Sequence, residues 1–182
     1  WMGSMMASSV AGSAEVMGRT QRSSAHYFQR PDRTTTGDGL FSARLDPAAT
    51  ALRGYGAFTR VGKDGGTVVW EAMGNVRSPG FEVNDLSFLS RTDFVWFNGN
   101  AGANFTTPTS WYRAIGFTLG GATQYNFDGD RTYSQLQAFY WMRFLNYWGL
   151  RTFAIRSLPS QDDRLTRGGP VVKKDGYDMA FV

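Results

Sequence analysis

Apolar and polar residues alternate along several long stretches of this chain. In TVVWEAMGNVR, residues 67–77, one set of alternate positions is wholly apolar, namely Val68, Trp70, Ala72, Gly74 and Val76. The intervening positions are mostly polar and include Glu71 and Asn75. A period of two is typical of a β-strand whose two faces meet different surroundings. We therefore expect the two sets on opposite faces of a sheet.

The same pattern recurs toward the C-terminus. In residues 132–144, Leu136 and Ala138 fall in the apolar set, and Gln135 and Gln137 fall in the other. Further full strands are expected at 51–61, 93–103, 111–125 and 149–158, and partial ones near 1–9 and 176–182. We predict an all-β, antiparallel chain of about eight strands, without an internal domain boundary in residues 1–182.

Strand length and aromatic content favour a membrane environment. Several runs reach the nine to eleven residues that a tilted strand needs to cross a bilayer, whereas soluble strands usually have about five or six. Aromatic residues make up 15% of the chain and charged residues 19%, against about 25% charged in average globular domains. Aromatic side chains at strand ends are typical of membrane–water interfaces. Those within or near the expected strands are Trp70, Trp96, Trp111, Tyr112, Tyr125, Trp141, Tyr147 and Trp148.

The fold that we predict is a transmembrane β-barrel, present here as an incomplete segment. The alternative is a soluble β-sandwich whose core holds the same aromatic residues. The chain ends, WMGSMMASS and DGYDMAFV, resemble strand interiors, and no basic leader precedes the first. We expect residues 1–182 to be a fragment of a longer chain. The longest uncharged run, Trp1 to Ala14, is too short for a membrane helix.

The connections between the expected strands differ in length. Residues 62–66 and 146–149 form short links, whereas 10–50, 78–92 and 159–176 are long. Outer-membrane barrels have short periplasmic turns and longer extracellular loops. We therefore expect the long connections at one end, outside the cell.

The segment RSPGFEVNDLSFLSR, residues 77–91, is expected to fold over or into the barrel mouth as an ordered loop. Its apolar side chains are expected to be buried, because a free loop would expose too much apolar surface; they are Phe81, Val83, Leu86, Phe88 and Leu89. Arg77 and Arg91 flank the segment and are candidates to pair with Glu82 or Asp85.

Four short stretches resemble the DUF5916 family and occur in order: YFQRPD (27–32), GKDGG (62–66), RSPGFEVNDLSFL (77–89) and LTRGGP (165–170). The resemblance implies a bacterial protein with an exported domain similar to carbohydrate-binding module family 9. That domain precedes a C-terminal region similar to an outer-membrane β-barrel. It further implies the bacterial outer membrane as the location and lipid as a partner. It supplies no catalytic or ligand residue that can be placed on this chain.

Composition excludes several kinds of site. The chain has no cysteine, which excludes disulfides and thiolate metal sites. The net charge of +4 is modest and the basic residues are scattered, so we expect no nucleic-acid partner. His26 is the single histidine. Ser23 and Ser24 are near it, but neither has the Gly-x-Ser-x-Gly context of a hydrolase, so a loop histidine is favoured over a catalytic triad.

Acidic residues suggest two further sites, and each has a simpler explanation. Asp128 and Asp130 flank Gly129 as in part of a calcium loop, but the other ligands are missing, and an Asp-Gly turn explains the pattern. Glu82 and Asp85 could form a glycosidase-type pair, although loop-capping acids are the favoured interpretation. The stretch 166–174 lacks the form of a phosphate loop.

These observations predict a non-enzymatic outer-membrane barrel segment that takes part in surface binding or uptake, with glycans as the candidate ligand. No catalytic, cofactor-binding or metal-binding residue is assigned, and no cofactor is expected. Two alternatives stay open. One is a glycan-active enzyme, which would need clustered acids at the mouth from 78–92 and 159–176. The other is a soluble β-sandwich binding module.

Overall fold

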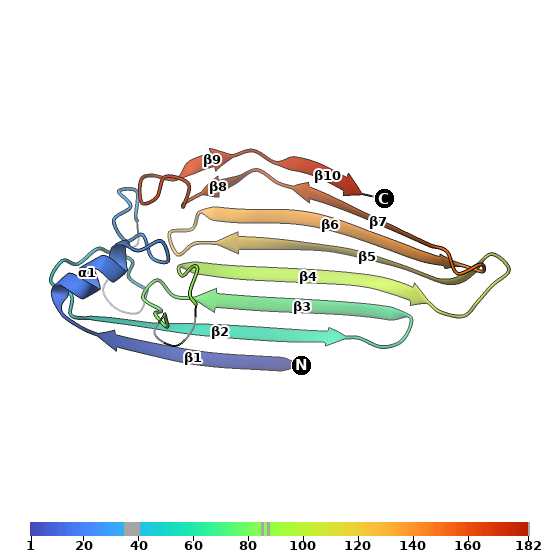
Figure 1. Ribbon diagram of the computed structural model, residues 1–182, viewed down its shortest axis with the longest axis horizontal. Coiled ribbons are helices and arrows are strands. Elements are labelled where there is room, and N and C mark those ends of the chain that lie inside the picture. Colours follow the sequence, from blue (N-terminus) through green and yellow to red (C-terminus); the bar gives the residue numbers. More distant parts are fainter. Residues whose placement is uncertain (35–40, 85, 87, 182) are drawn as a thin grey trace.

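The computed structural model describes residues 1–34, 41–84, 86 and 88–181, and these form one large antiparallel sheet (Figure 1). Its eight strands follow the order β1-β2-β3-β4-β5-β6-β7-β10. They are β1 (Met2–Ala11), β2 (Ala51–Lys63), β3 (Val68–Arg77), β4 (Phe94–Phe105), β5 (Tyr112–Tyr125), β6 (Arg131–Phe144), β7 (Gly149–Ser157) and β10 (Tyr177–Phe181). The all-β antiparallel prediction is confirmed. The sheet is open, with β1 and β10 as its two edges.

Smaller elements occupy two of the connections. The helix α1 (Ala14–Arg22) follows β1, and β8 (Ser160–Asp162) pairs with β9 (Val172–Lys174) as a separate hairpin between β7 and β10. The Ser13 side chain caps α1 by accepting a hydrogen bond from the Val16 backbone N–H at 3.3 Å, which satisfies one free donor of the first turn. In the described part of the chain, no helix is long and apolar enough to cross a membrane.

The strands are long, and each has two distinct faces. The strands β2, β4, β5 and β6 have 13, 12, 14 and 14 residues. Residues directly opposite each other in an antiparallel ladder share a face. Glu71 pairs with Asn100, and Asn75 pairs with Trp96, so these residues lie on one face of the sheet. We call it the polar face and its opposite the apolar face.

Many side chains of the apolar face are exposed, although Ala138 is half-buried and Met142 is buried on the same face. Val68, Trp70, Ala72 and Leu136 are exposed. Larger side chains beside them, Phe97, Phe117 and Leu119, are 54%, 45% and 61% exposed. A soluble sandwich would place a second sheet over this face, and the described residues contain none there.

On the polar face, charged and amide side chains form contacts from one strand to the next. Arg60 of β2 donates from Nε to the Glu71 carboxylate of β3, and the Asn98 amide of β4 donates to the Gly121 carbonyl at 3.2 Å. One ion pair lies on the apolar face, between Arg156 and Asp178, with 3.9 Å separating the two groups. Both residues are near the ends of their strands, so the middle of the apolar face stays free of charge.

The connections alternate between the two ends of the sheet. The helix α1, the hairpin of β8 and β9, and the long connection between β3 and β4 lie together at one end, with the short turn 126–130. The connections 64–67, 106–111 and 145–148 lie at the opposite end (Figure 1). The grouping expected from connection length is therefore confirmed. We call the first group the cap; its described residues are 12–34, 41–50, 78–84, 86, 88–93, 126–130 and 158–176.

The cap packs onto the polar face through the loop between β3 and β4. A Cβ atom at Gly54 would lie 2.2 Å from the Phe81 backbone nitrogen, and one at Gly56 would touch the Phe81 ring at 3.5 Å. These two glycines of β2 therefore leave room for Phe81, which is 1% exposed. Phe81 forms one small core with Ala25, Leu89 and Val83.

A second small core of the cap contains Met17, Phe28, Ala43 and Leu52. In the segment 77–91, Phe81 and Leu89 are buried and Val83 packs against them, as expected. The expectation that all its apolar side chains are buried is wrong for Leu86 and Phe88, which are 90% and 89% exposed. Leu86 and Phe88 lie between Phe81 and Leu89 in the sequence but do not belong to the small core that these two residues form.

The expected ion pairs of this segment are also wrong where the structure describes them. Arg91 pairs with Asp163 at 2.8 Å, and Arg77 donates to the Arg91 carbonyl at 3.3 Å. Glu82 points instead to His26. Asp85 lies outside the described residues. Asp163 and His26 belong to other connections, distant in the sequence, so the segment alone could not indicate these two contacts.

The difference between the two faces predicts opposite responses to a new charge. Ala72→Arg places a guanidinium in the middle of the apolar face and should destabilise the folded protein by about 2–4 kcal/mol if that face meets lipid at the bilayer midplane. Gln137→Arg, on the polar face, should change stability only slightly. The measurement is the free energy of unfolding in lipid bilayers. Equal losses in the two variants would contradict the assignment of the faces.

Candidate functional site

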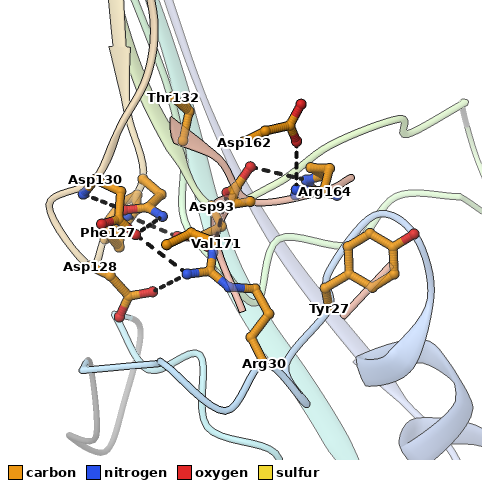
Figure 2. A network of polar contacts seen from close by, with 12 residues as sticks. Tyr27, Arg30, Asp93, Phe127, Asp128, Asp130, Thr132, Asp162, Arg164 and Val171 are labelled. Carbon is orange, nitrogen blue, oxygen red and sulfur yellow. Dashed lines mark hydrogen bonds and ion pairs between the residues drawn. The ribbon is translucent and has the colours of Figure 1, made fainter. Parts of the chain in front are cut away.

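Arg30 stands at the centre of a buried ionic cluster in the cap (Figure 2). Its Nε atom lies 3.2 Å from Asp32, and its two terminal nitrogens lie 3.3 Å from Asp163 and 3.4 Å from Asp130. Asp128 lies 3.8 Å from one of them. These carboxylates come from three separate connections, so one guanidinium joins segments far apart in the sequence.

Arg33 extends the cluster on the side of the turn between β5 and β6. It contacts Asp93 at 2.5 Å and Asp128 at 3.0 Å. Asp93 also accepts a hydrogen bond from the Phe127 backbone N–H at 2.9 Å, and Asp128 accepts one from the Thr34 backbone N–H. Asp93 has a positive φ of 61°, which a residue other than glycine adopts at a cost of order 1–3 kcal/mol. The contacts with Arg33 and Phe127 hold it in this conformation.

Arg164, which follows β8, contacts the loop after α1 and the loop before β4. Its guanidinium donates to the carbonyls of Ser24, Ala25 and Thr92, and it lies 5.4 Å from the centre of the Tyr27 ring. Burial, together with the nearby Arg91, lowers the pKa of Arg164 to about 10. The side chain still carries its charge at neutral pH.

The surroundings shift the pKa values of the cluster's acids in different directions. Burial raises the pKa of Asp93, and Arg33 and the Phe127 N–H counter that effect only in part. At Asp32, hydrogen bonds from the Val171 N–H and Arg30 outweigh burial, so the pKa of the carboxyl lies below its usual value. Asp32 is therefore held ionised next to Arg30.

His26 is a buried member of the cap. Its Nδ1 atom lies 2.9 Å from the Pro79 carbonyl oxygen, and its Nε2 atom lies 2.9 Å from the Glu82 carboxylate. The Thr92 hydroxyl lies 3.2 Å from Nδ1, so both ring nitrogens of His26 have polar neighbours within the cap. At Glu82, hydrogen bonds from His26 and from backbone N–H groups outweigh burial, so the pKa of the carboxyl lies below its usual value.

The candidate residues named from the sequence take structural positions in the cap. His26 is in a loop, as favoured, and its ring contacts neither Ser23 nor Ser24 in any hydrogen bond of the described residues. Asp128 and Asp130 sit in a turn in which Gly129 has a φ of 91°, and both contact Arg30. No group of three or more potential metal ligands gathers in the described part of the chain.

A cavity of about 420 Å³ lies beside the cluster, between the cap and the sheet. Trp96, Gln124 and Tyr133 form part of its lining, and they occupy neighbouring positions on β4, β5 and β6 in the strand register. Because Trp96 pairs with Asn75, this part of the lining belongs to the polar face. Arg91, Gln161 and Asp163 line it from the cap.

Fold and site together define an all-β protein with long antiparallel strands and an arginine–carboxylate cap at one end. The family model for "Domain of unknown function (DUF5916)" matches residues 21–163, and the chain belongs to this family. The match includes Arg30, Arg33 and Asp163 but ends before LTRGGP (165–170). Neither the curated proteins nor the solved structures contain a match to the chain.

Sequence reasoning missed most of this cluster. It selected acids and the histidine for possible chemistry, but it gave no role to Arg30, Arg33 and Arg164. Arg91 was expected to pair within its own segment, whereas it contacts Asp163. A usable signal was present, because Arg30 and Asp32 lie in YFQRPD, one of the stretches that carried the family resemblance.

Because of this cluster, we expect a single substitution that removes one positive charge to lower the stability of the cap strongly. Arg30→Gln would leave several buried carboxylates without their common counter-charge and should destabilise the cap by about 3–5 kcal/mol. Arg19→Gln is the matched control, because Arg19 pairs with Glu15 on α1 with side chains 77% and 74% exposed. Exposed pairs contribute about 0–1 kcal/mol.

The measurement for both variants is amide hydrogen exchange across residues 78–84. The Arg30→Gln variant should lose protection there, and the Arg19→Gln variant should keep it. Unchanged protection in Arg30→Gln would show that the cap does not depend on the cluster.

Proposed function

We propose that this chain is a segment of a bacterial outer-membrane β-barrel whose capped mouth binds glycans at the cell surface or during uptake, without catalysing a reaction. The observation that carries the proposal is the exposed apolar face of strands that reach 14 residues. A face of this kind is costly in water, and lipid is the environment that suits it. The opposite face is polar, as expected of a lumen.

The ends of the sheet fit the same proposal. Exposed aromatic side chains lie at or near the short turns, including Trp111, Tyr147 and Trp148 at 57%, 69% and 77%. Amphipathic rings of this kind favour the membrane–water interface. The longer connections gather at the other end, which we assign to the outside of the cell by analogy with barrels of known orientation.

Glycans are the ligand class that we propose because of the family resemblance and the polar character of the capped end. An enzyme would need acids free to act at the mouth. The structure does place acids there, but Asp93 and Asp163 contact arginines, and Glu82 contacts His26. Their surroundings favour a structural role, so binding is preferred over catalysis.

Cysteine labelling tests location and orientation together, because the chain has no cysteine of its own. Leu86→Cys changes a cap residue that is 90% exposed. Gly65→Cys changes the turn between β2 and β3, where an added Cβ atom meets nothing within 4 Å. A membrane-impermeant maleimide should label Leu86→Cys on intact cells and Gly65→Cys only after the outer membrane is opened.

The labelling experiment has two contrary results. Labelling of Gly65→Cys alone on intact cells would reverse the orientation. Recovery of both variants in the membrane-free fraction would contradict the membrane location.

A further inference from the structure

The apolar face carries an open groove of about 650 Å³ along its C-terminal strands. Its lining comes from β5, β6, β7 and β10. Ala138, Ala154 and Ala180 face one another across three of these strands in the register, so they form a row of small side chains. Leu119 and Leu136 also line the groove, and both are exposed. The groove is therefore apolar and accessible from outside the sheet.

A second hollow, of about 590 Å³, lies at the cap end of the same strands and is basic. Three positively charged residues line it, all of them exposed: Arg131, Lys173 and Lys174. None of the three forms an ion pair with another described residue. Of the two acids in the lining, Asp130 already contacts Arg30 at 3.4 Å, which leaves Asp175. The hollow therefore has an excess of positive charge.

The basic hollow borders the apolar face. Tyr125 lines the hollow and pairs in the register with Val95 of β4. Val95 pairs in turn with Val76, which belongs to the apolar set of β3. An exposed tyrosine at the end of an apolar strand face is typical of the membrane–water interface. The hollow thus lies where the apolar face meets the cap.

The groove and the hollow follow each other along one pair of chain segments. Residues 154–156 and 178–180 line the groove, and residues 159–161 and 173–175 line the hollow. The hairpin of β8 and β9 continues β7 and β10 toward the cap (Figure 1). From residue 174 to residue 180 an extended chain spans roughly 20 Å. One leaflet of a bilayer, with its headgroups, is also about 20 Å thick.

The two parts together match a lipid that carries a phosphate group. Lysine and arginine donate charge-assisted hydrogen bonds to phosphate oxygens, and basic pockets at the membrane boundary bind anionic headgroups. The apolar groove is suited to an acyl chain. A soluble anion would use the hollow alone and leave the groove without an occupant. The adjoining groove therefore favours a lipid over a free phosphate ion.

We propose that this face holds one phosphate-bearing lipid as a specific ligand. Its phosphate lies at Arg131, Lys173 and Lys174, and one acyl chain follows the row of alanines. This inference rests on the membrane location in the proposed function and adds a lipid class and a defined site. With the cap outside the cell, the lipid belongs to the outer leaflet.

Native mass spectrometry of the full chain, released from an uncharged detergent, tests the site. The probes are phosphatidylglycerol, phosphatidylcholine, whose choline group cancels the phosphate charge, and inorganic phosphate as the soluble anion. Each is titrated, and the retained fraction gives an apparent affinity. Phosphatidylglycerol should be retained in preference to both comparisons.

The basic part of the site is tested by Lys173→Gln. This variant should weaken retention of phosphatidylglycerol about fivefold, the value of one lysine next to anionic lipid. Lys63→Gln is the matched control, because Lys63 is exposed and pairs with Trp70 at the opposite end of the same face. It should leave retention unchanged.

The apolar part is tested by Ala154→Phe, which fills the groove without changing the charge. Ala154 is exposed, so the larger side chain enters the groove rather than the interior of the protein. Retention should weaken about threefold to tenfold, because the acyl chain loses its van der Waals contacts there. Ala101→Phe is the control, since Ala101 is exposed on the same face and does not line the groove.

The outcomes distinguish this inference from the proposed function. Equal losses in Lys173→Gln and Lys63→Gln would show diffuse attraction and overturn the site. Retention of inorganic phosphate that depends on Lys173 would assign the hollow to a soluble anion and overturn the lipid. No preference among the three probes would also overturn the inference, while the membrane location would still rest on cysteine labelling. Recovery of the protein in the membrane-free fraction in that labelling experiment would overturn both.

Discussion

The architecture of the capped end depends on one guanidinium group that is withdrawn from water. A buried charge is tolerated only when oppositely charged or hydrogen-bonding groups lie close to it. The partners of Arg30 belong to three connections, and the most distant of them in the sequence, Asp163, is 133 residues away. The loops cannot take unrelated positions while all of these contacts are made. The cluster therefore holds the hairpin of β8 and β9 against the connection between β1 and β2. This arrangement forms the cavity between the cap and the sheet.

The sheet depends on a different constraint, the separation of its two faces. Long strands with one apolar face need an apolar medium or a covering layer. The described residues supply no layer over Trp70 or Leu119. The cap instead packs on the polar face, where Gly54 and Gly56 admit Phe81. Cap and apolar face thus lie on opposite sides of the sheet, an arrangement that suits a lumen plugged at one end.

Much of the fold could be predicted because the alternation of apolar and polar residues within each strand is a local feature of the sequence. The period-two pattern around Trp70 and Leu136 gave the strands and their faces, and connection length gave the grouping of loops at one end. The helix α1 was missed because it is a single short element inside a long connection. Leu86 and Phe88 were placed wrongly because apolar character alone does not tell which part of a loop turns outward.

The site was much less predictable. Arg30, Asp130 and Asp163 meet only through tertiary folding, and no local pattern predicts which arginine will contact which acid. The same holds for the cavity, because Trp96 of the sheet and Gln161 of the cap line it together only once the cap is folded onto the sheet. Family resemblance marked some of the stretches involved, such as YFQRPD, but not their contacts.

The central claim is that the apolar face of this sheet meets lipid. Single spin labels placed in turn at residues 68–76 of β3, in the full-length protein in lipid bilayers, test it most directly. The account predicts that accessibility to oxygen peaks at Trp70 and Ala72 and accessibility to a water-soluble nickel complex peaks at Glu71 and Asn75, with a period of two. High nickel accessibility at every position, or no alternation, would contradict it.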